Sequence, residues 1–150
     1  MIGIEMVKTI AQLTALIAAD ESLTDQRLER GRLLLEMGDT KGAADDCQWL
    51  LEHVEPSAEL LLFAARLASA KGKTDEALDY YNKVIALNPQ EVAAYQERGK
   101  IFYQKGYSRQ AEEDLRKALE LNPQQILKMS GDYQAEGIEH RPKRSYLKNV

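Results

Sequence analysis

The residues of this chain that could do chemistry are few and poorly placed for it. Cys47 is the only cysteine, and His53 and His140 are the only histidines. A catalytic thiol needs a base within hydrogen-bonding distance. His53 follows Cys47 by six positions on one predicted helix, so the two side chains face different sides. A single cysteine also excludes an internal disulfide and a multi-cysteine zinc site. We expect Cys47 to be an inert core residue.

Runs of carboxylates are the next candidates, for a metal site. Asp45 and Asp46 are adjacent, as are Glu112, Glu113 and Asp114. Neighbouring residues of a helix diverge by about 100°, so such runs suit a solvated face better than a ligand set. No strand is apparent, and therefore no glycine-rich loop follows one to hold phosphate. We predict no enzyme, no metal and no cofactor.

The composition favours a folded, water-soluble domain. Hydrophobic residues make up 44% of the 150 residues and charged residues 29%, with a net charge of −4, which is an ordinary globular mix. At the N-terminus, Glu5, Lys8 and Gln12 interrupt the apolar residues, and no basic region precedes them. We therefore predict no signal peptide and no membrane span, and we expect a cytoplasmic protein.

The chain repeats itself every 34 residues. The sequence Leu-Asn-Pro-Gln at 87–90 returns at 121–124. The same shift relates four columns of small or hydroxyl-bearing residues: Gly38, Gly72 and Gly106; Ala43, Ala77 and Ala111; Gly31, Ala65 and Gly99; Thr40, Thr74 and Ser108. A period of this length is typical of a supersecondary unit that buries its apolar face only by stacking on its neighbours.

Each column has a physical reason. The Gly38 column ends a first helix, where a positive φ is often required. The Thr40 column opens a second helix, where a hydroxyl can accept a hydrogen bond from a free backbone N–H. Small residues in the Gly31 and Ala43 columns let two antiparallel helices cross closely. Proline disfavours helix in the residue before it, so the second helix stops at Asn88 and its equivalent.

These columns resemble the tetratricopeptide repeat. We place the repeats at 24–57, 58–91 and 92–125. The resemblance implies an all-α, right-handed α-solenoid of three helix–turn–helix units. Arg30 and Arg98 stand where the family usually has leucine, and we expect them to weaken packing. The third unit is the best match, with the family's preferred residue types at Tyr95, Gly99, Phe102, Ala111, Ala118 and Pro123.

Both ends of such a stack need a cover. In the segment 1–23 the apolar residues recur at helical spacing, which predicts an N-terminal capping helix over about 5–19. In the segment 126–150 we expect a short capping helix and then a basic tail, either mobile or lightly docked. Trp49 shares a column with two lysines, so it either anchors a partner or folds over onto the N-terminal helix. The stripe that predicts the first cap is Ile10, Leu13, Leu16 and Ile17.

The resemblance also implies a concave groove lined by the first helices. One inward column is basic in every unit, and apolar, amide and aromatic residues flank it. Arginine binds carboxylates with two hydrogen bonds, so an acidic, partly apolar peptide or helix would suit this trough. The alternative is that the arginines pair with acidic residues of the groove, such as Asp25 or Glu59. The predicted partner-binding residues are Leu28, Arg32, Leu62, Arg66, Gln96, Lys100 and Tyr103.

Three functions remain open at this stage. The first is an interaction module or scaffold that binds a partner protein in the groove. The second is a structural protein that forms homo-oligomers through the ends of the solenoid or through Trp49. The third and most distant is nucleic-acid binding, against which the acidic body of the chain counts. Chaperone-tail binding is disfavoured, because Glu97 stands where the family's carboxylate clamp needs a positive or neutral residue.

Overall fold

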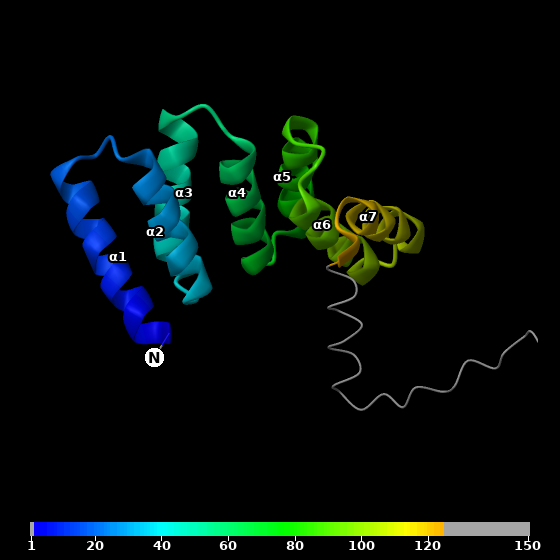
Figure 1. Cartoon of the computed structure of the whole chain (residues 1–150), viewed down its shortest axis with the longest axis horizontal. Coiled ribbons are helices and arrows are strands. Elements are labelled where there is room, and N and C mark those ends of the chain that lie inside the picture. The colour runs from blue at the N-terminus through cyan, green and yellow to red at the C-terminus, as the bar shows by residue number, and fades with distance from the viewer. Residues whose placement is uncertain (1, 125–150) are drawn as a thin grey trace, which may run out of the picture.

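The protein is an all-α helical repeat solenoid (Figure 1). The computed structural model describes residues 2–124, and within that range it contains seven helices and no strand. The expected C-terminal capping helix and the basic tail lie outside the described residues. The helices are α1 (Ile2–Ala19), α2 (Thr24–Glu36), α3 (Thr40–His53), α4 (Ala58–Ala70), α5 (Thr74–Leu87), α6 (Val92–Gln104) and α7 (Ser108–Leu121).

Helices α2 to α7 pair as three hairpins, α2–α3, α4–α5 and α6–α7. Each hairpin turns at a glycine in the left-handed region, with φ of 85° at Gly38, 74° at Gly72 and 82° at Gly106. The Gly38 N–H donates to the Leu35 carbonyl, so the carbonyls at the end of the first helix are satisfied locally. The glycine column therefore has the role that its spacing predicts.

The hydroxyl column does not have its predicted role. Thr40 and Thr74 are the first residues of their helices rather than N-caps. The cap of α3 is the preceding residue, Asp39, whose carboxylate accepts from the Gly42 N–H at 2.9 Å. The second helix begins one residue earlier than predicted, so the turn is one residue shorter. The hydroxyl-bearing residues therefore lie in the first turn of the helix, one position after the N-cap.

Two apolar clusters form the core. One joins α2 and α3 to α4 around Leu50 and Phe63, and the other joins α4 and α5 to α6 around Tyr81 and Val84. The small columns lie where helices cross, as predicted: Ala43 and its equivalents are almost fully buried. Burial of Phe63 and Tyr81 supplies much of the apolar contact, since large aromatic side chains dominate core energetics.

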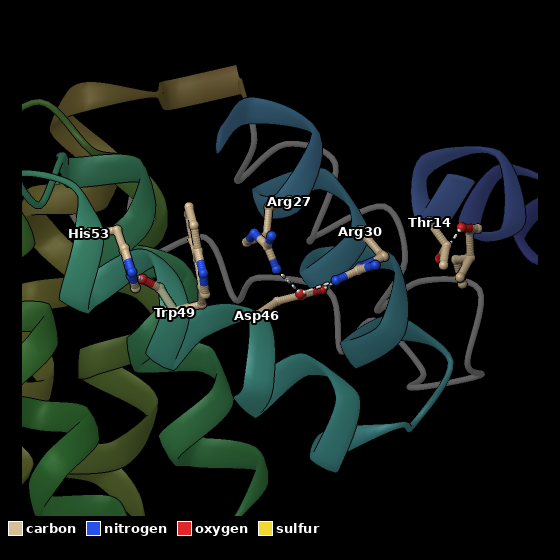
Figure 2. A network of polar contacts seen from close by, with 7 residues as sticks. Thr14, Arg27, Arg30, Asp46, Trp49 and His53 are labelled. Atoms are coloured by element: carbon tan, nitrogen blue, oxygen red, sulfur yellow. Dashed lines mark hydrogen bonds and ion pairs between the residues drawn. The ribbon is translucent and has the colours of Figure 1, made fainter. Parts of the chain in front are cut away.

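Arg30 and Arg98, predicted to weaken packing, instead form buried ion pairs inside their hairpins. The Arg30 guanidinium donates two hydrogen bonds to Asp46, with Nε 2.9 Å from Oδ2 (Figure 2). Arg98 binds Asp114 in the same way, at 2.8 Å. Asp46 is only 2% exposed. The prediction that the acidic runs form a solvated face is therefore wrong for these two aspartates, because both point into the hairpin towards an arginine.

Trp49 is covered on both faces. The Arg27 guanidinium lies 3.9 Å from the centre of one face, and the His53 ring stacks on the other at 4.2 Å between ring centroids (Figure 2). His53 Nδ1 also donates to the Trp49 carbonyl at 2.7 Å. Trp49 therefore packs on its own hairpin rather than on α1. The ring stack and this hydrogen bond fix the position of the His53 ring.

Cys47 gives a first testable prediction, on pH and stability. Burial raises the pKa of its thiol to about 11, above the ordinary value of a cysteine. Between these two values the unfolded chain releases the thiol proton and the folded chain keeps it, so the free energy of unfolding falls as pH rises. We expect this thiol to contribute up to about 2 kcal/mol to that fall.

Urea denaturation at pH 8 to 11 would measure the effect against a Cys47→Val variant, which retains the burial but cannot titrate. We expect the wild-type chain to lose stability more steeply than the variant over this range. Equal slopes for the two proteins would mean that the thiol titrates normally and is not held in the core.

Helix α1 differs from the rest. It packs chiefly against α2, and Ile17 is its only buried residue. By length and composition it could cross a membrane, and it is the one helix in the range 2–124 that could. The prediction that the chain has no membrane span is therefore not supported by its longest helix.

Candidate functional site

The first helices of the three hairpins, α2, α4 and α6, carry the predicted binding surface. A hollow of about 390 Å³ lies between α4 and α6, and Tyr81 of α5 forms part of its wall. We name it the α4–α6 hollow. It brings together Arg66 and Lys100, two of the predicted binding residues. The lining residues are Arg66, Ser69, Ala70, Tyr81, Glu97, Lys100, Ile101 and Gln104.

The arginines of the basic column are paired with carboxylates of the following hairpin. Arg32 Nη2 lies 2.6 Å from Glu59 Oε1. Arg66 donates from Nε and Nη2 to Glu97 at 2.8 to 3.0 Å. Each pair joins two first helices, so it bridges hairpins instead of lying along one helix. Both pairs are partly solvent-exposed, which limits what they add to stability.

Glu97 connects this surface to the core. Besides the hydrogen bonds from Arg66, Glu97 accepts one from the Tyr81 hydroxyl at 2.8 Å. The hydrogen bonds to Glu97 raise the pKa of Arg66, so the guanidinium stays charged. Burial, followed by the negative charge of Glu97, raises the pKa of Tyr81 well above its ordinary value. Tyr81 therefore remains a hydrogen-bond donor that holds Glu97 against Arg66.

Lys100 is the cation of the column that stays free. It is exposed at the rim of the hollow. No carboxylate within residues 2–124 forms an ion pair with it. The hollow thus holds two positive groups, Arg66 and Lys100, and one negative group, Glu97, which leaves one positive charge uncompensated.

The other predicted binding residues are distributed between core and surface. Leu28 and Leu62 are buried and offer a peptide little surface, because their side chains pack into the two core clusters. Gln96 is half-buried, and Tyr103 is 74% exposed. Neither lines the α4–α6 hollow. The structure therefore brings together two of the three predicted basic residues, Arg66 and Lys100, but not the predicted apolar ones.

Sequence reasoning missed Glu97 and Tyr81 as members of the site. In the first of the two ion pairs Arg32 binds Glu59, but the residue equivalent to Glu59 one repeat later is Ala93. Arg66 therefore reaches a carboxylate one turn further along α6. A search for charged residues within one helical turn of each missing partner could have found Glu97. The direction of the Tyr81 hydroxyl has no signal in the sequence.

The chemistry of this arrangement is that of charged groups and hydrogen bonds. Within the described range there is no group of three or more His, Cys, Asp or Glu residues that could hold a metal ion. The polar groups of the hollow are hydrogen-bond donors and acceptors at the surface. Such a surface suits the side chains of a partner segment.

Comparison with known proteins agrees with this architecture. A family model described as "TPR repeat" matches residues 69–106, and one described as "Tetratricopeptide repeat" matches residues 92–125. No curated protein matches the sequence.

Several solved structures share the fold. A crystal structure of MamA has a TM-score of 0.68 and 21% identity over 76% of this chain and 67% of that chain. MamA 41-end from Desulfovibrio magneticus RS-1 has a TM-score of 0.71 and 16% identity over 81% and 68%. YrrB, described as a TPR protein with an unusual peptide-binding site, has a TM-score of 0.72 and 20% identity over 88% and 68%. The chain thus spans about two thirds of each of these proteins.

Proposed function

Because this chain is a tetratricopeptide repeat protein, we propose that it is a scaffold whose α2, α4 and α6 surface holds an acidic, partly apolar segment of a partner protein. Repeats of this family form protein-interaction modules, and YrrB is described by its peptide-binding site. The proposal commits to the α4–α6 hollow as the centre of that surface.

The observation that carries the proposal is the uncompensated positive charge of the hollow. Lys100 is exposed, has no carboxylate partner among residues 2–124, and lies beside Arg66 at one rim. A carboxylate of the partner would bind Lys100 without breaking any existing ion pair. Arg66 is available only if the incoming carboxylate displaces Glu97, so its contribution is reduced by that competition.

The exposed ring of Tyr103 and the exposed methyl group of Ala70 offer the apolar contacts. These contacts replace Leu28 and Leu62, which are buried. The partner segment is therefore expected to carry one essential carboxylate and a neighbouring apolar side chain, rather than a long acidic run.

A second testable prediction follows for the charges of the hollow. Lys100→Glu is expected to weaken binding of an acidic peptide on the order of tenfold to a hundredfold, the value of one charge-assisted hydrogen bond. Glu97→Gln is expected to strengthen binding, because it frees the Arg66 guanidinium. The measurement is selection of a random displayed peptide library on the immobilised full chain, followed by titration of the enriched peptides.

Lys41→Glu provides the matched control, since it makes the same charge change at an exposed position of α3 that forms no ion pair with residues 2–124. Circular dichroism would establish that each variant is folded. The proposal is wrong if enriched peptides lack acidic residues, or if Lys41→Glu weakens binding as much as Lys100→Glu.

Self-assembly is the second candidate function, and one observation favours it. Leu115 and Leu119 of α7 are 47% and 40% exposed, on the last described helix of the solenoid. Light scattering after size exclusion would test it with the full chain. A monomer would exclude this candidate, and an oligomer that Leu119→Glu dissociates would support it. The cover on both faces of Trp49 counts against a contact through that ring.

A further inference from the structure

Apolar residues lie on most sides of helix α1, and Glu5, Lys8 and Gln12 share one narrow sector. Its exposed large apolar side chains point in several directions, because successive residues of a helix turn by about 100°. One partner helix can cover only a stripe, whereas an apolar surface this wide is typical of a helix within a core or a membrane. Only Ile17 is buried in this fold, so α1 is no core helix. These exposed residues are Ile2 at 77%, Ile4 at 61%, Val7 at 52% and Leu16 at 50%.

The polar side chains of α1 are largely satisfied within the helix itself. Lys8 Nζ lies 3.4 Å from Glu5 Oε1, so the two charges are paired. Thr9 Oγ1 donates to the Glu5 carbonyl at 2.9 Å, and Thr14 Oγ1 donates to the Ile10 carbonyl at 2.7 Å. Hydroxyls bonded to their own backbone are tolerated where no water is present. Gln12 is the polar side chain of α1 that has no such bond.

The dimensions of α1 also suit a bilayer. Its 18 residues span about 27 Å at ~1.5 Å per residue, close to the hydrocarbon thickness of about 30 Å. The helix ends at Ala19, and a polar turn follows in which Asp20 accepts hydrogen bonds from Ser22. The apolar segment and the solenoid are therefore separated by a charged boundary.

Helix α1 is held to the solenoid mainly at its C-terminal end. Ile17 is buried there, but a hollow of about 500 Å³ lies at the other end of the helix. Its walls are almost entirely apolar and include Ile2, Met6 and Leu33. The contact with α2 thus leaves apolar surface exposed on both helices. Figure 1 shows α1 as the outermost helix at this end of the solenoid.

We propose that α1 inserts into the hydrocarbon region of a lipid bilayer and anchors the solenoid, which stays in water from Thr24 onward. The docked position on α2 is then the state that the helix adopts in the absence of lipid, and lipid shifts the population towards insertion. The attraction is apolar, since the chain carries a net charge of −4 and the charges of α1 are one Glu and one Lys that pair with each other. This anchor is independent of the proposed peptide binding.

The test is flotation of the full chain with neutral phosphatidylcholine vesicles on a density gradient. The informative variant is Ala11→Glu, an exposed position at the middle of α1. In water this change meets solvent, but in a bilayer it places a carboxylate at the centre of the hydrocarbon. We expect its partition into vesicles to fall on the order of a hundredfold. Leu87→Glu is the matched control, because Leu87 is an apolar residue of α5 that is 58% exposed.

We expect the wild-type chain and Leu87→Glu to float with the vesicles and Ala11→Glu to remain behind. The proposal is overturned if the wild-type chain does not float, or if Ala11→Glu floats equally well. Binding that requires anionic lipid and disappears at high salt would also overturn it, since the basic segment after His140 would then be responsible. A dimer that Ala11→Glu dissociates, without flotation, would assign α1 to a second copy of the chain instead.

A further arm separates this proposal from the peptide-binding proposal. Lys100→Glu should float like the wild-type chain, and Ala11→Glu should bind selected peptides like the wild-type chain. Loss of flotation in Lys100→Glu would show that the hollow, and not α1, contacts the vesicle.

Discussion

Replacing Asp46 by alanine is expected to lower the free energy of unfolding by about 3–5 kcal/mol, the usual cost of removing one partner of a buried ion pair. Asp46 is 2% exposed and accepts two hydrogen bonds from Arg30. A second arginine, Arg27, lies within 3.6 Å. The variant would leave two guanidinium groups in the hairpin without an anion. Urea denaturation followed by circular dichroism would measure the loss.

Two further variants separate charge from packing. Asp114→Ala should cost less, about 1–3 kcal/mol, because Arg98 keeps a hydrogen bond to Asn82 at 2.8 Å. Arg30→Ala with Asp46→Tyr copies the residues that the α4–α5 hairpin carries at the equivalent positions, Ala64 and Tyr80. We expect this double variant to be more stable than Asp46→Ala. A loss below about 1 kcal/mol for Asp46→Ala would show that water reaches both arginines.

The fold of this protein could be predicted from its period, and the reason is local. Gly38 and the two glycines spaced from it by one and two repeats adopt positive φ, and the small residues of the Ala43 column are buried at helix crossings. Each of these features depends on one residue type at one position. Because the unit is repeated, each such position occurs three times in the chain. The three units can therefore be compared with one another within a single sequence.

The ion pairs could not be predicted in the same way, because each depends on two residues whose spacing varies. Taken separately, Arg30 is an arginine at a position where leucine is usual, and Asp46 is a surface acid. Together they form one buried ion pair. On the proposed binding surface, the carboxylate that meets the arginine changes register between hairpins: Arg32 pairs with Glu59, and Arg66 pairs with Glu97. Comparing equivalent positions of the repeats cannot find a carboxylate that lies at a different repeat position in each pair.

Helix α1 shows the same weakness of reading charged residues separately. Its charged residues, Glu5 and Lys8, interrupt the apolar sequence and argue against a membrane span when counted one at a time. In the helix they are three residues apart and neutralise each other. The number of charges in a segment therefore overstates its polarity whenever those charges are paired.

The second large effect concerns the contact between Gly31 of α2 and Phe63 of α4. Phe63 is 2% exposed, so Phe63→Ala is expected to cost about 3–5 kcal/mol through lost burial and the cavity left behind. A Cβ at Gly31 would meet Phe63 Cζ at 2.8 Å, which is too close for an aromatic ring fixed in a core. Gly31→Ala is therefore expected to cost about 1–3 kcal/mol in the wild-type chain.

Combining the two changes tests whether the ring is the cause. Once Phe63 is alanine, a methyl group at position 31 enters vacated space and the better helix propensity of alanine is gained. The cost of Gly31→Ala should then disappear, and the double-mutant cycle should show a coupling energy of about 1–3 kcal/mol. Gly99→Ala is the matched control, because its nearest atom is Asp114 Cβ at 3.2 Å, with no aromatic ring close by. Equal costs for Gly31→Ala in both backgrounds would mean that the glycine is needed for some contact other than Phe63, and that the α2–α4 junction is not set by this ring.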